Sequence, residues 1–118
     1  MAQRLPNYLR AFRKRSALSQ DEVTFLLGAH GGAKVCRHER FLRTPSLETA
    51  LAYEAIFRKS VSELFPGIYE KIERQVRTRA KVLLARHFNH LPAHIKNRKR
   101  QSLDDISGDG TNVESNLL

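Results

Sequence analysis

The stretch SQDEVTFLLGAHGGAKVCRHER, residues 19–40, decides the fold because it reads as two short helices joined by a glycine-rich turn. Ser19 is a good N-cap and Glu22 follows it by three residues, which is the capping-box pattern of a helix start. Gly28 has no Cβ and can take the left-handed conformation that ends a helix. After a short turn, the second helix is expected over residues 32–40.

Apolar residues recur at helical spacing beyond this stretch, for example at Leu47, Leu51 and Ala55. Strict alternation of apolar and polar residues, which would indicate strands, does not occur. The sequence therefore predicts an all-α protein with a five-helix domain over residues 6–66. The five helices are expected over residues 6–16, 19–28, 32–40, 46–57 and 60–65. Ser46 supplies the N-cap of the fourth.

A long amphipathic helix is expected after this domain, over residues 67–90. Ser60 and Glu63 repeat the capping-box pattern shortly before it, and Pro66 is a residue type that often opens a helix. The apolar residues of the helix fall along one side, at Tyr69, Ile72, Val76, Ala80, Leu83 and Leu84. Such a stripe has to be covered, either by docking on the chain's own domain or by dimerisation with a second subunit.

The helical pattern ends at Leu91, and residues 91–118 are expected to form a flexible tail. The tail is basic at first, because residues 96–100 are nearly all Lys or Arg, and then acidic. The basic run is expected to add phosphate contacts that do not depend on sequence, because each neutralised phosphate releases counterions.

The chain of 118 residues has a formal net charge of +9, which points to a polyanionic partner. Residues 1–45 hold nine Lys and Arg against three Asp and Glu, and residues 68–100 hold ten against two. Nucleic acid is the first candidate partner and an anionic membrane surface the second. No apolar run is long enough to span a bilayer, and no signal peptide is expected at the N-terminus. Cys36 is the only cysteine, which fits a cytoplasmic protein.

Three segments of the chain occur in a familiar order: LRAFRKRSALSQDEVTFLLG (residues 9–28), VCRHER (35–40) and PSLETALAYEAIFRKSVSELF (45–65). Together they resemble the XRE-type helix-turn-helix regulators, the family of the phage repressor and Cro proteins. The resemblance covers about half of the chain. It implies a sequence-specific DNA-binding transcription regulator, not an enzyme, that acts as a homodimer with the helix over residues 32–40 in the major groove. Arg58 departs from the pattern, since the family often has glycine there.

The resemblance also implies roles for individual residues. The implied DNA-contacting residues are Gln20, Gly31, Gly32, Ala33, Lys34, Arg37, Arg40, Arg43 and Thr44. Lys34 and Arg37 are three residues apart and therefore share a helix face, with Arg37 suited to guanine and Lys34 to a phosphate. Arg13 and Glu39 match positions that pair between the first and third helices of the family. His38 is expected to be partly buried.

Two other functions stay open at this point. An antitoxin-like protein would use the same fold on DNA while its last helix or tail binds a protein partner, and a charge-driven binder would take DNA or RNA of any sequence. A nucleotide-binding P-loop is disfavoured, because GAHGGAKV has Ala33 where glycine is needed and Val35 where a hydroxyl would bind magnesium. His87, His90 and His94 lie at helical spacing without companion cysteines, so neither a metal site nor a cofactor is expected.

Overall fold

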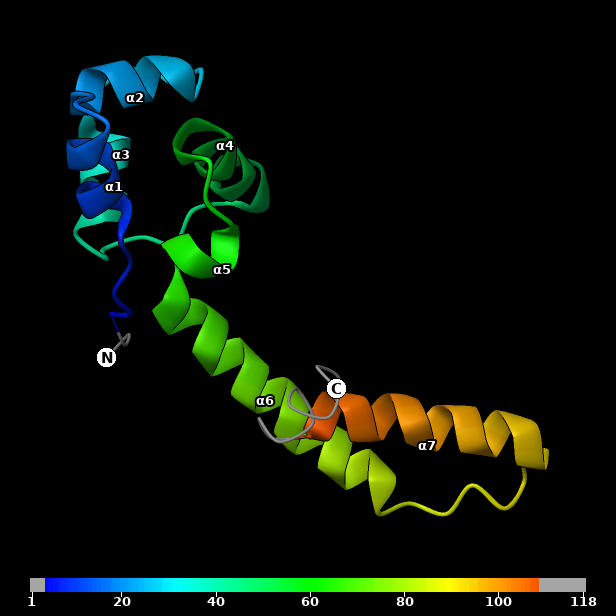
Figure 1. Cartoon of the computed structure of the whole chain (residues 1–118). Helices are drawn as coiled ribbons and strands as arrows, with labels where there is room; N and C mark the ends of the chain where they lie inside the picture. Colours follow the sequence, from blue (N-terminus) through cyan, green and yellow to red (C-terminus); the bar gives the residue numbers. More distant parts are fainter. Residues whose placement is uncertain (1–3, 109–118) are drawn as a thin grey trace. The chain divides into compact units, whose positions relative to one another are not determined.

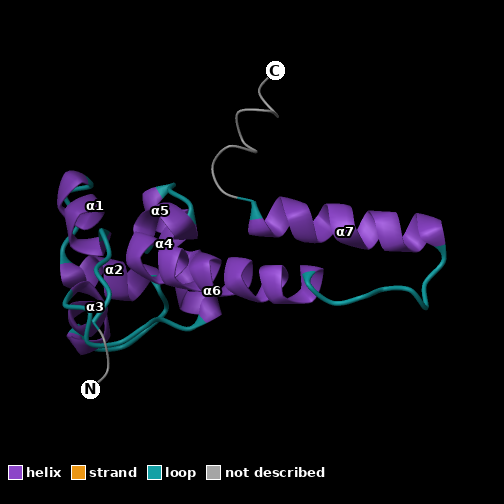
Figure 2. Cartoon of the chain, turned by 90° about the horizontal axis from the view of Figure 1, so that it is seen from below, coloured by secondary structure: helices purple, strands orange, loops and turns teal. Residues whose placement is uncertain are grey.

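The computed structural model describes residues 4–108, and within that range the chain is all-helical, as predicted (Figure 1). The seven helices of these residues are α1 (Leu9–Arg15), α2 (Gln20–Leu26), α3 (Ala33–Glu39), α4 (Leu47–Phe57), α5 (Val61–Leu64), α6 (Pro66–Leu84) and α7 (Ala93–Ser107). Loops alone connect them, and the described range contains no strand (Figure 2). The chain divides after Glu70, within α6, into two compact units, which we call the N-terminal and C-terminal units.

Serine side chains cap three helices of the N-terminal unit, at the positions that the sequence predicts. Ser19 Oγ accepts a hydrogen bond from the Glu22 N–H, and the Glu22 carboxylate accepts one from the Ser19 N–H at 2.8 Å. Ser60 and Glu63 form the same reciprocal box before α5, and Ser46 caps α4. Because each cap satisfies a backbone N–H that the helix itself leaves free, local chemistry fixes where these helices begin.

Residues with a left-handed backbone end the first four helices. Gly28 follows α2 in that conformation with a φ of 71°, as predicted. Ala17 after α1, Phe41 after α3 and Arg58 after α4 have φ values of 58°, 63° and 58°. These three residues carry a Cβ, so each stop includes steric strain that glycine would avoid.

The core of the N-terminal unit is one apolar cluster to which each of its first five helices contributes. Leu9, Val23, Val35, Tyr53 and Leu64, from α1 to α5 in turn, are almost completely buried. Both α1 and α2 pack against α3 and α4, and α4 packs against α5. Two neighbouring helices therefore hold α3 in place.

The buried face of α4 is not the one that Leu47, Leu51 and Ala55 mark in the sequence. Those three side chains are exposed. Tyr53 and Phe57 lie in the core instead, with their rings stacked 6.2 Å apart. Because α4 has apolar residues on more than one side, periodicity identifies the helix correctly but cannot choose the side that is buried.

The C-terminal unit has a second, smaller core. Ala80 of α6, Phe88 of the connecting segment and Leu103 of α7 are buried together. Leu84 and Leu91, near the two ends of the connection, pack against them. The two helices of this unit are therefore joined by an apolar contact of their own.

Helix α7 corrects the prediction of a flexible tail from residue 91. Residues 93–107 are helical, and the basic run 96–100 lies within the helix. The prediction fails because α7 depends on Leu103 packing against residues of α6, and a scan of the local pattern does not detect that non-local contact. Residues 109–118, the remainder of the predicted tail, lie outside the described range.

Candidate nucleic-acid interface

The turn between α2 and α3 uses glycine for two different reasons. Gly31 has a φ of 79°, which other residues adopt only with strain. Gly32 is the N-cap of α3, and a Cβ placed there would lie 3.0 Å from Oδ1 of Asp21 in the first turn of α2. A side chain at position 32 would therefore displace the Asp21 carboxylate, which is exposed and able to turn away.

Helix α3 has one buried face and one exposed basic face. Val35, His38 and Glu39 are buried in the N-terminal unit. The exposed residues of α3 and its C-cap are Ala33, Lys34, Arg37 and Arg40. Lys34 and Arg37 thus lie together on the outward side of the helix, as their spacing predicts.

The exposed basic residues continue past the end of α3. Arg43 and Thr44 are exposed in the connection to α4. No ion pair within residues 4–108 involves Lys34, Arg37, Arg40 or Arg43. Four unneutralised cations therefore lie within one short segment, and their combined potential attracts a polyanion.

The predicted pair of Arg13 and Glu39 is present and anchors α3 to α1. Arg13 Nε and Nη2 donate to the two carboxylate oxygens of Glu39 at 2.5 Å and 3.1 Å. The side chains are 13% and 3% exposed. Arg13 Nη1 also donates to the Leu18 carbonyl at 3.0 Å. The hydrogen bond to Glu39 raises the pKa of Arg13 against the opposing effect of burial. The pair therefore fixes the orientation of α3 on the unit.

Gln20, which was predicted to contact DNA, takes part in the same network. Its Nε2 donates to Oε1 of Glu39 at 3.1 Å, and its side chain is half-buried. The Glu39 carboxylate on α3 therefore accepts hydrogen bonds from side chains of both α1 and α2. Because an amide nitrogen has two hydrogens, Gln20 keeps a second donor beside the exposed face.

A second buried network, which the sequence reasoning missed apart from the burial of His38, holds the same C-terminal end of α3 from another side. His38 Nδ1 and the Tyr53 hydroxyl share a hydrogen bond of 2.8 Å, and Asn7 Nδ2 donates to the His38 carbonyl at 2.8 Å. Burial lowers the pKa of His38, and nearby cations lower it further. Those cations are Lys34, Arg43 and Arg37. Burial raises the pKa of Tyr53, so its hydroxyl stays protonated and able to donate.

Within residues 4–108, no three His, Cys, Asp or Glu side chains gather where they could hold a metal ion. The helices found in that range are all too short or too polar to cross a membrane.

Comparisons of the chain with protein-family models, with curated proteins and with solved structures give no match. Its function has to be inferred from its own residues. The most informative of these are the exposed cations of α3 and the two buried networks beneath them.

Proposed function

We propose that this chain is a sequence-specific DNA-binding transcription regulator of the XRE type, in which α2, the glycine turn and α3 form the helix-turn-helix. The observation that carries the proposal is the two-sided character of α3, which is ion-paired on its buried face and exposes unneutralised Lys and Arg on the other. A helix fixed in this way presents its donors at constant positions, and reading base edges in the major groove requires that.

Each exposed residue of the segment has a role under this proposal. Arg37 donates two parallel hydrogen bonds to O6 and N7 of a guanine, since a guanidinium group matches both acceptors. Lys34 lies one turn earlier and takes a phosphate. Arg40, Arg43 and Thr44 contact the DNA backbone where the chain leaves the groove.

The small residues before these cations allow the main chain to approach the DNA closely. Gly31 and Gly32 have no side chain to separate the turn from the DNA, and the Ala33 methyl group suits contact with a thymine methyl. Gln20 donates one amide hydrogen to Glu39 and its second amide hydrogen to a phosphate of the DNA. These residues place α3, whereas Arg37 supplies the base preference.

Selection of bound sites from random DNA duplexes tests the proposal. The wild-type chain should enrich a site with two related halves, roughly 34 Å apart if a symmetric dimer binds. Arg37→Ala should bind that site about 1–3 kcal/mol more weakly and lose preference at one base position, whereas Lys34→Ala should weaken selected and unrelated duplexes alike. Arg10→Ala, at an exposed position of α1 outside the interface, is the control. Enrichment of no site, or unchanged binding by both variants, contradicts the proposal.

The proposed homodimer needs a surface, and α6 carries one. Ile72, Val76 and Leu83 follow one side of the helix and are 51%, 44% and 38% exposed. A row of exposed apolar side chains favours contact with another chain. We assign this contact to a second copy in a cytoplasmic dimer. Sedimentation should therefore give a dimer for the wild type and a monomer for Ile72→Ser/Val76→Ser.

The same apolar row on α6 favours a second candidate, an antitoxin-like DNA-binding protein whose α6 binds a different protein. The oligomeric state separates the two candidates. A wild-type chain that sediments as a monomer while still enriching a DNA site favours the antitoxin-like protein over the homodimeric regulator.

A further inference from the structure

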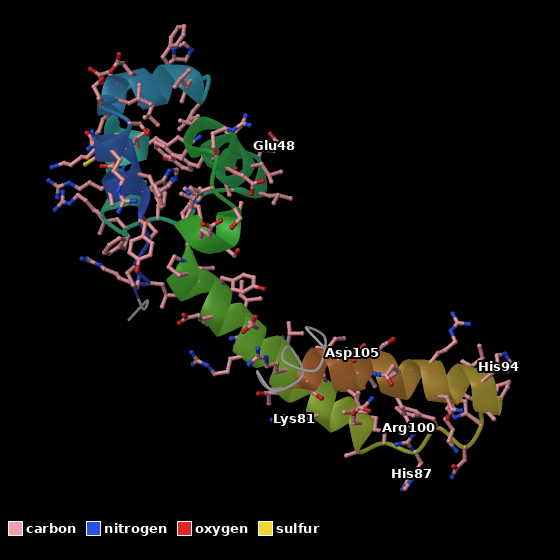
Figure 3. The ribbon with its side chains drawn as sticks, viewed as in Figure 1. Glu48, Lys81, His87, His94, Arg100 and Asp105 are labelled. Atoms are coloured by element: carbon pink, nitrogen blue, oxygen red, sulfur yellow. The ribbon has the colours of Figure 1, made fainter. Side chains whose placement is uncertain are left out.

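The order of charges along α7 does not follow the helix dipole. Residues 71–108 contain ten Lys and Arg against three Asp and Glu. In α7 the basic run 96–100 comes first and the acidic residues follow, as Arg100 and Asp105 illustrate (Figure 3). This order opposes the helix dipole, which favours acidic residues near the N-terminus and basic ones near the C-terminus. The helix dipole therefore does not account for the charges of α7.

A buried aromatic ring holds two cations of the basic run in place. Lys99 Nζ lies 4.8 Å from the centroid of the Phe88 ring, and Arg100 Cζ lies 5.4 Å from it. Phe88 is 5% exposed and belongs to the core formed with Ala80 and Leu103. Because the core fixes the ring, the ring's attraction for the two cations positions them before any ligand arrives.

Lys99 and Arg100 lie against the same ring without a neutralising partner. The ion pairs formed within residues 4–108 involve neither of them. Each of the two cations suits a phosphate group of its own, because phosphate oxygens accept strong charge-assisted hydrogen bonds from ammonium and from guanidinium groups.

We propose that Lys99 and Arg100, positioned by Phe88, form a second nucleic-acid contact that binds the phosphate backbone of duplex DNA whatever its sequence. The choice of DNA as the polyanion rests on the function proposed for α3. The contact differs from that expected of a flexible basic tail, because little chain entropy is lost when a preformed pair binds. It adds affinity and salt dependence but no base preference.

Titration of the full chain with a DNA duplex of arbitrary sequence, at several salt concentrations, tests this site. Each phosphate contact contributes about 0.9 to the slope of log affinity against log salt, so Lys99→Gln/Arg100→Gln should lower the slope by about two. Binding at ~0.1 M salt should weaken by about tenfold or more. The charge-conserving swap Lys99→Arg/Arg100→Lys should keep most of the slope.

A matched control removes the same amount of charge from the C-terminal unit. Arg74→Gln/Arg98→Gln changes exposed residues of α6 and α7 that do not stack on Phe88, and should lower the slope by less than about one. Circular dichroism should show unchanged helix content in every variant. Equal losses of slope in the two double variants overturn the site.

The salt-slope test of the Phe88 site and the base-preference test of α3 can fail separately. If the proposal for α3 fails, base preference is absent while the two double variants still differ in salt slope. If the Phe88 site fails, base preference remains and the two double variants have the same slope. A loss of base preference in Lys99→Gln/Arg100→Gln, with α7 still helical, also contradicts a purely backbone contact.

Discussion

Arg58 occupies a left-handed backbone position, which suits glycine better than a residue with a Cβ. Its φ is 58°, and it is the C-cap of α4. Arg58→Gly should raise the free energy of unfolding by about 0.5–1 kcal/mol, because the relief of left-handed strain exceeds the extra entropy that glycine loses on folding. Denaturant titration measures the change.

Arg58→Ala is the control for the loss of the arginine side chain. Alanine keeps the Cβ and therefore the strain, so this variant should unfold at nearly the same denaturant concentration as the wild type. If Arg58→Gly and Arg58→Ala have equal stabilities, the backbone strain assigned to this position does not matter.

His38 should make the stability of the protein depend on pH. Its pKa in the folded protein lies below the ordinary value of 6.5, so the unfolded chain takes up a proton at a higher pH than the folded chain. The stability that the neutral imidazole contributes is therefore complete above about pH 6.5 and is lost as the pH falls below that value. The melting temperature should fall from about pH 7.5 to 5.5, and fall less in His38→Gln.

Thermal melts of both proteins across this range provide the measurement, and an NMR titration of the imidazole gives the sign directly. Glutamine preserves a side chain that can hydrogen-bond to Tyr53 but cannot be protonated in this range. Parallel pH curves for wild type and His38→Gln would show that the buried imidazole is not responsible.

Between elements, the Arg13–Glu39 pair joins α1 to α3, and its two partners are not equivalent. Glu39 is 3% exposed and Arg13 13%. Arg13→Ala leaves a buried carboxylate without its cation, which should cost about 3 kcal/mol of stability. Glu39→Ala should cost less, because the longer Arg13 side chain can turn toward water. The double variant should be less harmful than the sum of the single ones, as chemical denaturation would reveal.

Helix starts were predictable from the sequence because their causes are local. Ser19 and Ser60 each bond a backbone N–H three residues away, so both partners of the interaction are close together in the sequence. The partner of His38 was not predictable in this way, because Tyr53 lies fifteen residues further on and on a different helix. The network on Glu39 was foreseen only as a pair, since nothing in the local pattern indicates that Gln20 joins it.

The difference between local and distant interactions also explains why the sequence did not predict α7. Its basic run and scattered apolar residues suggest a solvated tail when they are considered alone. The helix forms on Leu103, whose neighbours in the small core are Ala80 and Phe88. Packing partners this distant in sequence determine order without leaving a periodic signal.

At the scale of the whole molecule, the two separate cores predict two separable responses to mutation. Leu103→Ala should destabilise α7 by about 2–3 kcal/mol, because it leaves a cavity beside Phe88. Amide exchange should accelerate in α7 and leave α1 to α5 unchanged. Ile106→Ala, at an exposed position of the same helix, should alter neither. Faster exchange throughout the chain would mean that the two cores unfold as one.

The single thiol of the chain lies on α3 and allows that helix to be labelled chemically. Cys36 is half-buried on α3, between the buried face and the side that carries Lys34 and Arg37. A maleimide dye added to the unaltered protein can therefore attach at one position only. If α3 enters a groove, bound duplex should slow this alkylation, and the labelling rate would report occupancy of the helix without any engineered residue.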